Sequence, residues 1–224
     1  MLPPSEFIQV AEEVKLIDAI SRWVMNEACR AATNWSRPLK IAVNISAIEF
    51  EEGNLVATIS DALATSGLTP ERLEIEITET VLMTNTDLVI DTLNSIRDLG
   101  VSVAMDDFGT GYSSLGYLCK FPFDKLKIDR SFLLSNDRQP QSKRIIEAII
   151  TLGHSLDLNV VAEGVEHPEQ LAMLEALSCS EAQGFLLGKP MAAAAARTLV
   201  NEQNERTVSV PQNFSACSTA TVSG

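Results

Sequence analysis

The stretch Val101–Leu115, VSVAMDDFGTGYSSL, begins as an apolar strand and ends in two adjacent acids that are followed by a glycine-rich loop. Neighbouring carboxylates repel each other, and a strand ordinarily ends at a turn residue rather than at an acidic pair. Positive charge must therefore offset the repulsion between Asp106 and Asp107. The residues around this strand indicate what that charge is.

Strand and helix patterns alternate along most of the chain. Strands are predicted at 40–46, 72–79, 101–107, 125–129, 159–165 and 182–187, and helices at about 5–30, 54–67, 87–100, 142–156, 167–178 and 191–204. This repetition is typical of βαβ units and a parallel sheet. About six strands are visible where a closed (β/α)₈ barrel has eight. The sequence predicts an α/β fold with an incomplete barrel in one domain over 1–204, and a disordered tail over 205–224.

Composition narrows the class of protein. The chain has 224 residues, 46% of them hydrophobic, and a net charge of −13. Such a charge argues against a groove for duplex nucleic acid but allows an anionic ligand if cations lie between ligand and protein. No apolar run approaches the roughly 20 residues of a membrane span. The four cysteines are scattered, as in a reduced cytoplasmic protein, and two histidines argue against a histidine-based metal site.

Polar side chains recur at corresponding places on successive strands. Because alternate strand residues point to opposite sides, the apolar faces suit packing against helices. The opposite faces carry five polar residues, each near the carboxyl end of its strand: Asn44, Glu76, Asp106, Lys127 and Glu163. In a parallel barrel these ends meet at one rim, where barrel active sites lie. We therefore expect the five side chains to converge.

The acidic pair and its neighbours suit divalent cations. Oxygen ligands without histidine favour Mg²⁺ or Mn²⁺ over zinc. Two such ions roughly 4 Å apart are a common arrangement for cleaving a phosphodiester with a metal-activated water, which Lys127 would orient. The alternative is that Asp106 and Asp107 simply form ion pairs with Lys125 and Lys127. The loop Phe108–Leu118, directly after the acidic pair, is expected to be a mobile cover of the site.

Six motifs, in order, resemble those of the EAL-domain phosphodiesterases, bacterial enzymes that hydrolyse cyclic di-GMP to linear pGpG. They are NIS (44–46), EITET (76–80), DDFGTGYSSL (106–115), KLKID (125–129), AEGVE (162–166) and QGFLLGKP (183–190). The resemblance runs from about Leu2 to Met191. It implies a TIM-like barrel of the EAL type and two Mg²⁺ or Mn²⁺ ions.

The resemblance also implies roles for individual residues. Metal ligands are implied at Asn44, Glu76, Asp106 and Glu163, with Asp107 serving the second metal. Lys127 would hold the hydrolytic water, and Glu166 and Gln183 would position water or metal-bound groups. Glu79 would anchor the loop 108–118, whose residues Phe108, Gly109, Thr110 and Gly111 lie beside the substrate. The same loop would contribute to a homodimer.

One feature of the family has no counterpart in the quoted sequence. The name-giving Glu-Ala-Leu strand, whose glutamate is a metal ligand in the family, would precede the segment that begins at Leu2. The tripeptide at 175–177 falls within a predicted helix and does not correspond to it. The chain is therefore expected to be either a fragment of a longer product or a descendant without that ligand, with an open barrel edge and exposed apolar helix faces.

Three functions remain open on this sequence. The first is metal-dependent hydrolysis of cyclic di-GMP. The second is a catalytically inactive module of the same type that binds cyclic di-GMP or a protein partner. The third is an unrelated Mg²⁺-dependent lyase barrel, which fits the pattern of faces but not the six motifs.

Overall fold

The architecture is a single parallel sheet with helices on its outer side. The computed structural model describes residues 8, 10–11, 13–14, 16–51, 53–83, 86–110, 115–118, 120–134, 140–205 and 215–216. The strands run in sequence order: β1 (Ile41–Ile45), β2 (Leu73–Thr78), β3 (Ser102–Phe108), β4 (Lys125–Ile128), β5 (Asn159–Ala162), β6 (Glu181–Ala182) and β7 (Ser215–Ala216). Every neighbouring pair is parallel. This confirms the predicted TIM-like α/β fold.

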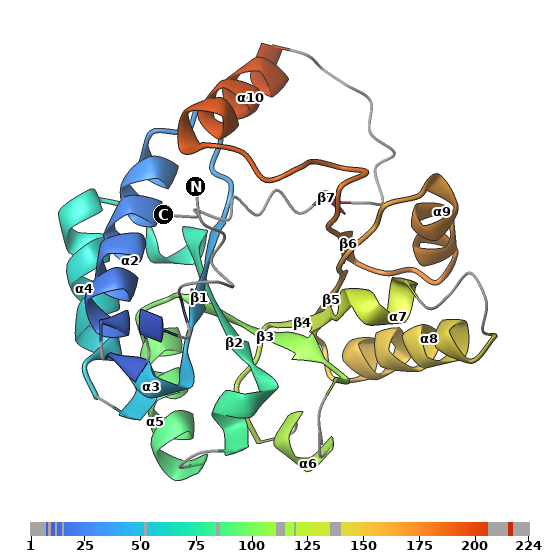
Figure 1. Cartoon of the computed structure of the whole chain (residues 1–224), viewed down its shortest axis with the longest axis horizontal. Coiled ribbons are helices and arrows are strands. Elements are labelled where there is room, and N and C mark those ends of the chain that lie inside the picture. Colours follow the sequence, from blue (N-terminus) through green and yellow to red (C-terminus); the bar gives the residue numbers. More distant parts are fainter. Residues whose placement is uncertain are drawn as a thin grey trace.

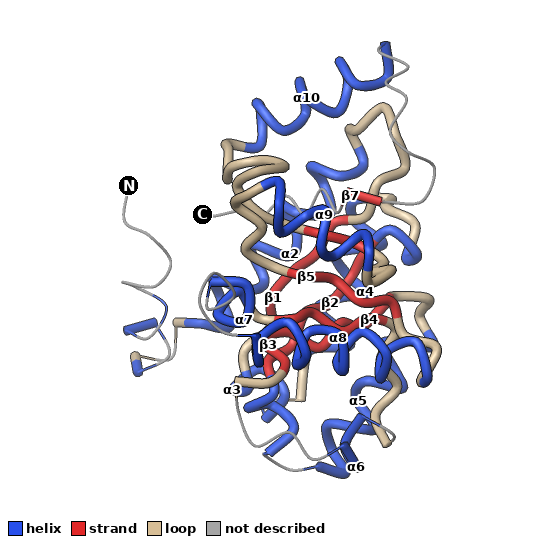
Figure 2. The backbone as a smooth tube through the Cα atoms, turned by 90° about the vertical axis from the view of Figure 1, so that its right-hand side faces the viewer, coloured by secondary structure: helices blue, strands red, loops and turns tan. Residues whose placement is uncertain are grey.

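Helices connect the strands and cover their outer face (Figure 1). The longer ones are α2 (Ile17–Thr33), α4 (Leu55–Ser66), α5 (Thr86–Asp98), α8 (Pro140–Ser155), α9 (Pro168–Ala176) and α10 (Ala193–Glu205). Shorter ones are α3 (Ala47–Glu51), α6 (Leu115–Leu118), α7 (Arg130–Leu134), and the 3₁₀ turns η1 (Pro70–Arg72) and η2 (Glu79–Met83). Figure 2 shows α5, α6 and α8 outside the strands. No helix among these is long and apolar enough to cross a membrane.

The hydrophobic core lies between the strands and these helices. The outward residues Ile75, Val103, Leu126 and Val160 have no solvent exposure. They are the apolar half of each strand's alternation, so their burial leaves the other half of each strand facing inward. The core therefore fixes which side chains reach the interior of the arc of strands.

The arc of strands is not closed among the described residues. β1 pairs only with β2, and β7 pairs only with β6. Large apolar side chains are exposed on several segments: Val10, Val14, Leu16, Trp23, Phe185, Leu187, Met191 and Leu199. Both observations agree with the open edge and exposed apolar surface expected from the sequence.

Three predicted elements have clearly different bounds in the structure, one of them the strand predicted at 159–165, which ends at Ala162. A single helix over 5–30 was expected, but the Leu16 N–H bonds to the Ala11 carbonyl at 2.8 Å, a wider turn than an α-helix makes, and α2 begins at Ile17. The last predicted strand, 182–187, ends at Ala182, and the chain then turns, with the N–H groups of Leu187 and Gly188 bonded to the Gly184 carbonyl at 3.0 Å.

The predicted tail, 205–224, falls almost entirely outside the described residues. Within it the structure describes Glu205, at the end of α10, and the pair Ser215–Ala216, which lies parallel to β6. The division into a domain over 1–204 and a disordered tail stays a prediction.

Candidate active site

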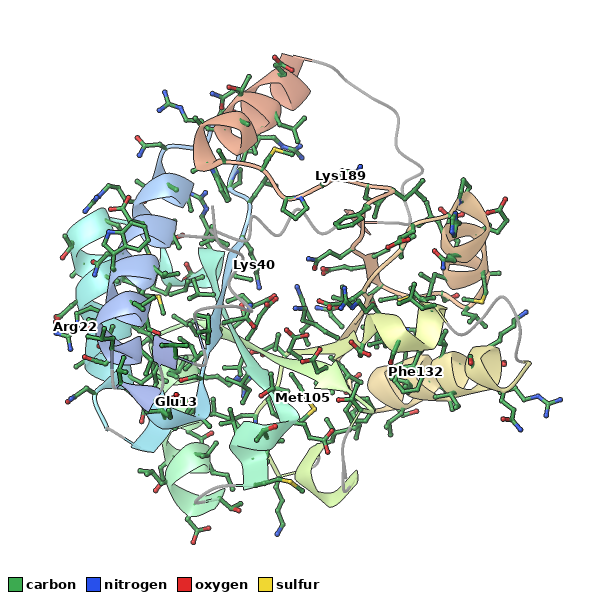
Figure 3. The ribbon with its side chains drawn as sticks, in the orientation of Figure 1. Glu13, Arg22, Lys40, Met105, Phe132 and Lys189 are labelled. Atoms are coloured by element: carbon green, nitrogen blue, oxygen red, sulfur yellow. The ribbon has the colours of Figure 1, made fainter. Side chains whose placement is uncertain are left out.

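A polar cavity of about 190 Å³ lies inside the arc of strands, at their carboxyl ends. Its lining residues come from six different strands or strand ends: Ala42, Asn44, Glu76, Asp106, Lys127, Glu163 and Gln183. Figure 3 shows nitrogen and oxygen atoms gathered in this interior. The five side chains that the sequence predicts to converge all line the cavity, together with Gln183.

Strand register explains the convergence. Asn44 is paired with Glu76 across β1 and β2, and Lys127 of β4 is paired with Val161 of β5. Glu163 follows the end of β5, where its N–H bonds to the carbonyl of Ile128 at 3.0 Å. Because neighbouring parallel strands keep their alternation in step, inward residues at one level form a layer. The inward residues nearest the carboxyl ends form the polar layer of the cavity; Asp106 and Lys127 lie in it one inward step beyond Ala104 and Lys125, the residues that continue the register of Glu76.

Lys127 lies at the centre of that layer. Its Nζ is 2.9 Å from Glu76 Oε1, 3.0 Å from Asp106 Oδ2 and 2.7 Å from Glu163 Oε1. Lys127 is 4% exposed. One buried ammonium group thus contacts three carboxylates and supplies part of the positive charge that the acidic end of β3 requires.

The electrostatics of this cluster follow from burial and from the excess of acids. Burial by itself would lower the pKa of Lys127, but Glu76, Asp106 and Glu163 outweigh it, so the pKa lies above its ordinary value. Burial raises the pKa of Glu76 to about 7, and Asp106 adds to this against the attraction of Lys127. Burial also raises the pKa of Glu163. The cluster holds more negative charge than a single lysine can neutralise.

Asp107 lies within β3 at a local irregularity, where the pairing with β4 shifts between Met105 and Phe108. Its φ of 54° is in the left-handed region, which a non-glycine residue rarely adopts. Its N–H bonds to Asp106 Oδ1 at 2.9 Å. Burial and the neighbouring carboxylates of Asp106 and Asp129 raise its pKa. Such local strain is common at functional sites, where the surrounding structure holds it in place.

The donor set suits a divalent cation. Asp106, Asp107 and Glu163 each offer one carboxylate oxygen, and these oxygens all lie within 4.8 Å of one another. Asn44 and Glu76 add an amide and a further carboxylate at the same cavity. Oxygen donors alone, in excess over the positive charge, are the ligands that Mg²⁺ and Mn²⁺ prefer.

Glu166 lies apart from these residues. It is exposed and does not line the cavity, although its neighbour Glu163 does. Its backbone N–H bonds to Gln170 Oε1 at 2.8 Å. The role near the site that the sequence implied for Glu166 stays a prediction.

The residues of the glycine-rich loop and its expected anchor are only partly described. Phe108 is the last residue of β3 and is buried, whereas Gly109 and Thr110 are exposed and Gly111 lies outside the described residues. Glu79 begins η2 and is buried, and its two carboxylate oxygens have no hydrogen-bond partner within the described part of the chain. The anchoring role of Glu79 stays a prediction.

A second group of inward polar side chains lies nearer the amino ends of the strands, and the sequence analysis did not predict it as a separate layer. Lys125 Nζ lies 3.0 Å from Glu74 Oε1 and 3.2 Å from Glu181 Oε2, which links β2, β4 and β6. The sequence did place Lys125 on the same face as Lys127, as a partner for Asp106 and Asp107. In the structure Lys127 pairs with Asp106, and Lys125 pairs one layer lower. Two-residue periodicity signals both layers, but only the fold tells which acid each lysine meets.

Comparison with known proteins gives one consistent result. The family model described as EAL domain matches residues 1–190. An uncharacterized signaling protein of Caulobacter vibrioides is 47% identical over 190 residues, which are 85% of this chain and 24% of that protein. The bifunctional diguanylate cyclase/cyclic di-GMP phosphodiesterase MucR of Pseudomonas aeruginosa is 41% identical over 197 residues, which are 86% of this chain and 29% of that protein.

Solved structures agree with the sequence relatives. One described as the PaMucR phosphodiesterase in complex with c-di-GMP has a TM-score of 0.83 and 41% identity, and covers 86% of this chain and 79% of that one. The EAL domain of Mycobacterium smegmatis DcpA has a TM-score of 0.77 and 35% identity, and covers 81% of this chain and 84% of that one. The chain spans 24% of the first of the curated relatives and 29% of MucR.

Proposed function

The chain belongs to the EAL domain family, and we propose on that premise that it hydrolyses cyclic di-GMP to linear pGpG at the cavity around Lys127, with two Mg²⁺ or Mn²⁺ ions. The observation that carries the proposal is the charge of the cavity. Four carboxylates, those of Glu76, Asp106, Asp107 and Glu163, meet one ammonium group in a space that a phosphodiester could reach only with further cations present.

The proposed division of labour follows the positions of the side chains. Asn44, Glu76, Asp106 and Glu163 would hold the first ion, and Asp107 would serve the second. The ions would supply a Lewis acid for the phosphate and a water of lowered pKa. We place Lys127 at that water, because its Nζ already lies among the three carboxylates.

The overall reaction consumes one water. Its oxygen bonds to phosphorus, the bond from phosphorus to one ribose 3′ oxygen breaks, and that oxygen takes up a proton. The product is a linear dinucleotide with a 5′ phosphate. Gln183, which lines the cavity, is proposed to position water or metal-bound groups. The same role is proposed for Glu166, three residues after Glu163 in the chain.

The remaining expectations are proposals from the family. Glu79 would anchor the loop 108–118, and Phe108, Gly109, Thr110 and Gly111 would lie beside the substrate. The homodimer would form through the same loop, of which residues 111–114 lie outside the described part. A cytoplasmic location agrees with the free thiols of Cys29 and Cys179, both of them buried.

The alternative is a module that binds cyclic di-GMP or a protein without hydrolysis. The ion pairs of Lys127 favour it, since they give three of the proposed ligand carboxylates a partner within the protein. A chain of this kind would bind the dinucleotide and release it unchanged.

Chromatography of a reaction mixture tests the proposal. Purified protein is incubated with cyclic di-GMP and Mn²⁺, and we expect linear pGpG to appear. We expect Glu76→Gln to abolish the product, and Glu71→Gln, at an exposed glutamate on η1, to leave it unchanged. Unchanged cyclic di-GMP with a folded protein that binds it would favour the binding module.

A further inference from the structure

The segment 163–167, which joins β5 to α9, carries the two glutamates proposed to act at the site. We propose that Gln170 is a positioning residue for this segment: its buried side-chain amide fixes the backbone at Glu166 and His167 and thereby the placement of the Glu166 carboxylate. The catalytic consequence rests on the proposed function, whereas the fixing of the backbone does not.

The side chain of Gln170, in α9, forms hydrogen bonds with the segment 163–167 and with α7. Its Oε1 accepts hydrogen bonds from the N–H groups of Glu166 at 2.8 Å and His167 at 3.0 Å. Its Nε2 donates to the carbonyl of Leu133 at 3.4 Å. Leu133 belongs to α7, which directly follows the strand that carries Lys127. One side chain thus ties the segment to α7.

Helix capping accounts for only one of these three bonds. A glutamine at the third position of a helix commonly accepts from the N–H at its start, as Gln170 does from His167. The bonds to Glu166, one residue outside the helix, and to α7 are not needed for a cap. Gln170 is 5% exposed, so its amide would be costly to bury without these partners.

The rest of the segment is held by backbone contacts. The N–H groups of Glu163 and Val165 bond to the carbonyls of Ile128 and Gln183, both at 3.0 Å. A Cβ at Gly164 would lie 2.4 Å from Arg130 Cβ, so this residue packs directly on the start of α7. The strand ends therefore secure the segment up to Val165, and Gln170 secures the N–H groups of Glu166 and His167.

Hydrogen exchange tests the structural half of the proposal without any need for turnover. Gln170→Leu keeps the approximate volume and removes the acceptor, which leaves two N–H groups without their partner. We expect the amides of Glu166 and His167 to exchange about fivefold faster or more, while those of Val160–Ala162 stay unchanged. Gln170→Glu keeps an acceptor oxygen and should restore most of the protection.

Activity tests the catalytic half. We expect Gln170→Leu to lower kcat about tenfold or more with KM within about twofold, since a small displacement of a catalytic group is costly to the chemical step. Gln170→Glu should recover most of kcat. The control is Leu174→Ala, which removes a fully buried apolar side chain from the same helix and is expected to lower the urea midpoint while leaving the hydrogen bonds of Gln170 in place.

The outcomes separate cleanly. Faster exchange and a lower kcat in Gln170→Leu, with kcat retained in an equally destabilised Leu174→Ala, support the proposal. Unchanged exchange at Glu166 and His167 overturns it. A loss of kcat in both Gln170→Leu and Leu174→Ala, in proportion to the stability that each variant loses, also overturns the proposal. A wild-type chain that forms no pGpG overturns the proposed function, and the exchange rates then decide the role of Gln170 by themselves.

Discussion

Lys127 is the residue on which the site depends. Its ammonium group is the common partner of Glu76, Asp106 and Glu163, and it holds them together where Mn²⁺ is proposed to bind. The alternation of strand residues was enough to predict that these side chains share one cavity. It could not predict the three short contacts of a single Nζ, because those depend on the curvature that brings β2 opposite β4 and the end of β5.

Replacing Lys127 should expose the repulsion that it masks. In Lys127→Met three buried carboxylates lose their partner, and we expect the free energy of unfolding without metal to fall by about 3 kcal/mol. Mn²⁺ should then stabilise the variant more than the wild type, because it meets an uncompensated cluster. Urea unfolding with EDTA or Mn²⁺ measures both effects. Lys143→Ala, at an exposed position, is the control, and equal stabilisation of variant and wild type by Mn²⁺ would argue against a cation site here.

Glu76 gives the metal-free protein a dependence on pH. Its pKa is raised from 4.5 to about 7. Between these pH values the unfolded chain releases a proton that the fold retains, so the free energy of unfolding falls as pH rises through that window. The stabilisation associated with Lys127, whose pKa is raised from 10.5, is constant over the same window.

Glu76→Gln isolates this effect because the amide does not titrate. In EDTA, the free energy of unfolding of the wild type minus that of the variant should decrease by a few kcal/mol from about pH 4.5 to about pH 7 and then level off. Urea titrations at several pH values measure the difference. A difference that does not change with pH would mean that Glu76 is already ionised in the fold.

At the scale of elements, the connection after β5 is the most tightly constrained part of the site. Its motif AEGVE could be recognised in the sequence, and Glu163 falls where strand alternation places it. Glu166 could not be placed in the same way, because the chain has left the strand and its path depends on Gly164, Gly184 and Gln170. β6 ends early beside this connection, where Gly184 packs against the backbone of Val165 and the chain turns.

Gly164 should tolerate no side chain. It has a φ of +74°, and a Cβ would lie 2.4 Å from Arg130 Cβ. Gly67 has a φ of +71° with nothing within 4 Å, so Gly67→Ala measures backbone strain alone, about 1 kcal/mol. We expect Gly164→Ala to destabilise by clearly more and to lower pGpG formation, as seen by urea unfolding and chromatography. Equal losses in the two variants would show that the contact with Arg130 yields without cost.

At the scale of the whole molecule, charge and topology act together. The order of strands and the side on which their carboxyl ends lie follow from the sequence pattern. The position of α10 does not follow from that pattern. Asn201 of α10 accepts a hydrogen bond from the N–H of Ser36 at 3.3 Å, which brings α10 beside the end of α2 (Figure 1). No local pattern links residues so far apart. The net charge of −13 surrounds a cavity that is itself acidic.

This charge predicts an order of binding. Cyclic di-GMP is an anion, so in EDTA we expect it to leave the melting temperature almost unchanged, and to raise it by several degrees once Mn²⁺ is present. Duplex DNA should have no effect in either condition. Thermal unfolding with each ligand measures this directly. Full stabilisation by cyclic di-GMP in EDTA would instead indicate a metal-independent binding module.

We propose that a water molecule held in this cavity attacks the phosphorus of cyclic di-GMP. The most direct measurement is a reaction with Mn²⁺ in water enriched in the heavy oxygen isotope, followed by mass spectrometry of the product. We expect pGpG with one heavy oxygen in its terminal phosphate, and no such product from Glu76→Gln. Recovery of unlabelled cyclic di-GMP alone, from protein that is folded and loaded with Mn²⁺, would contradict it.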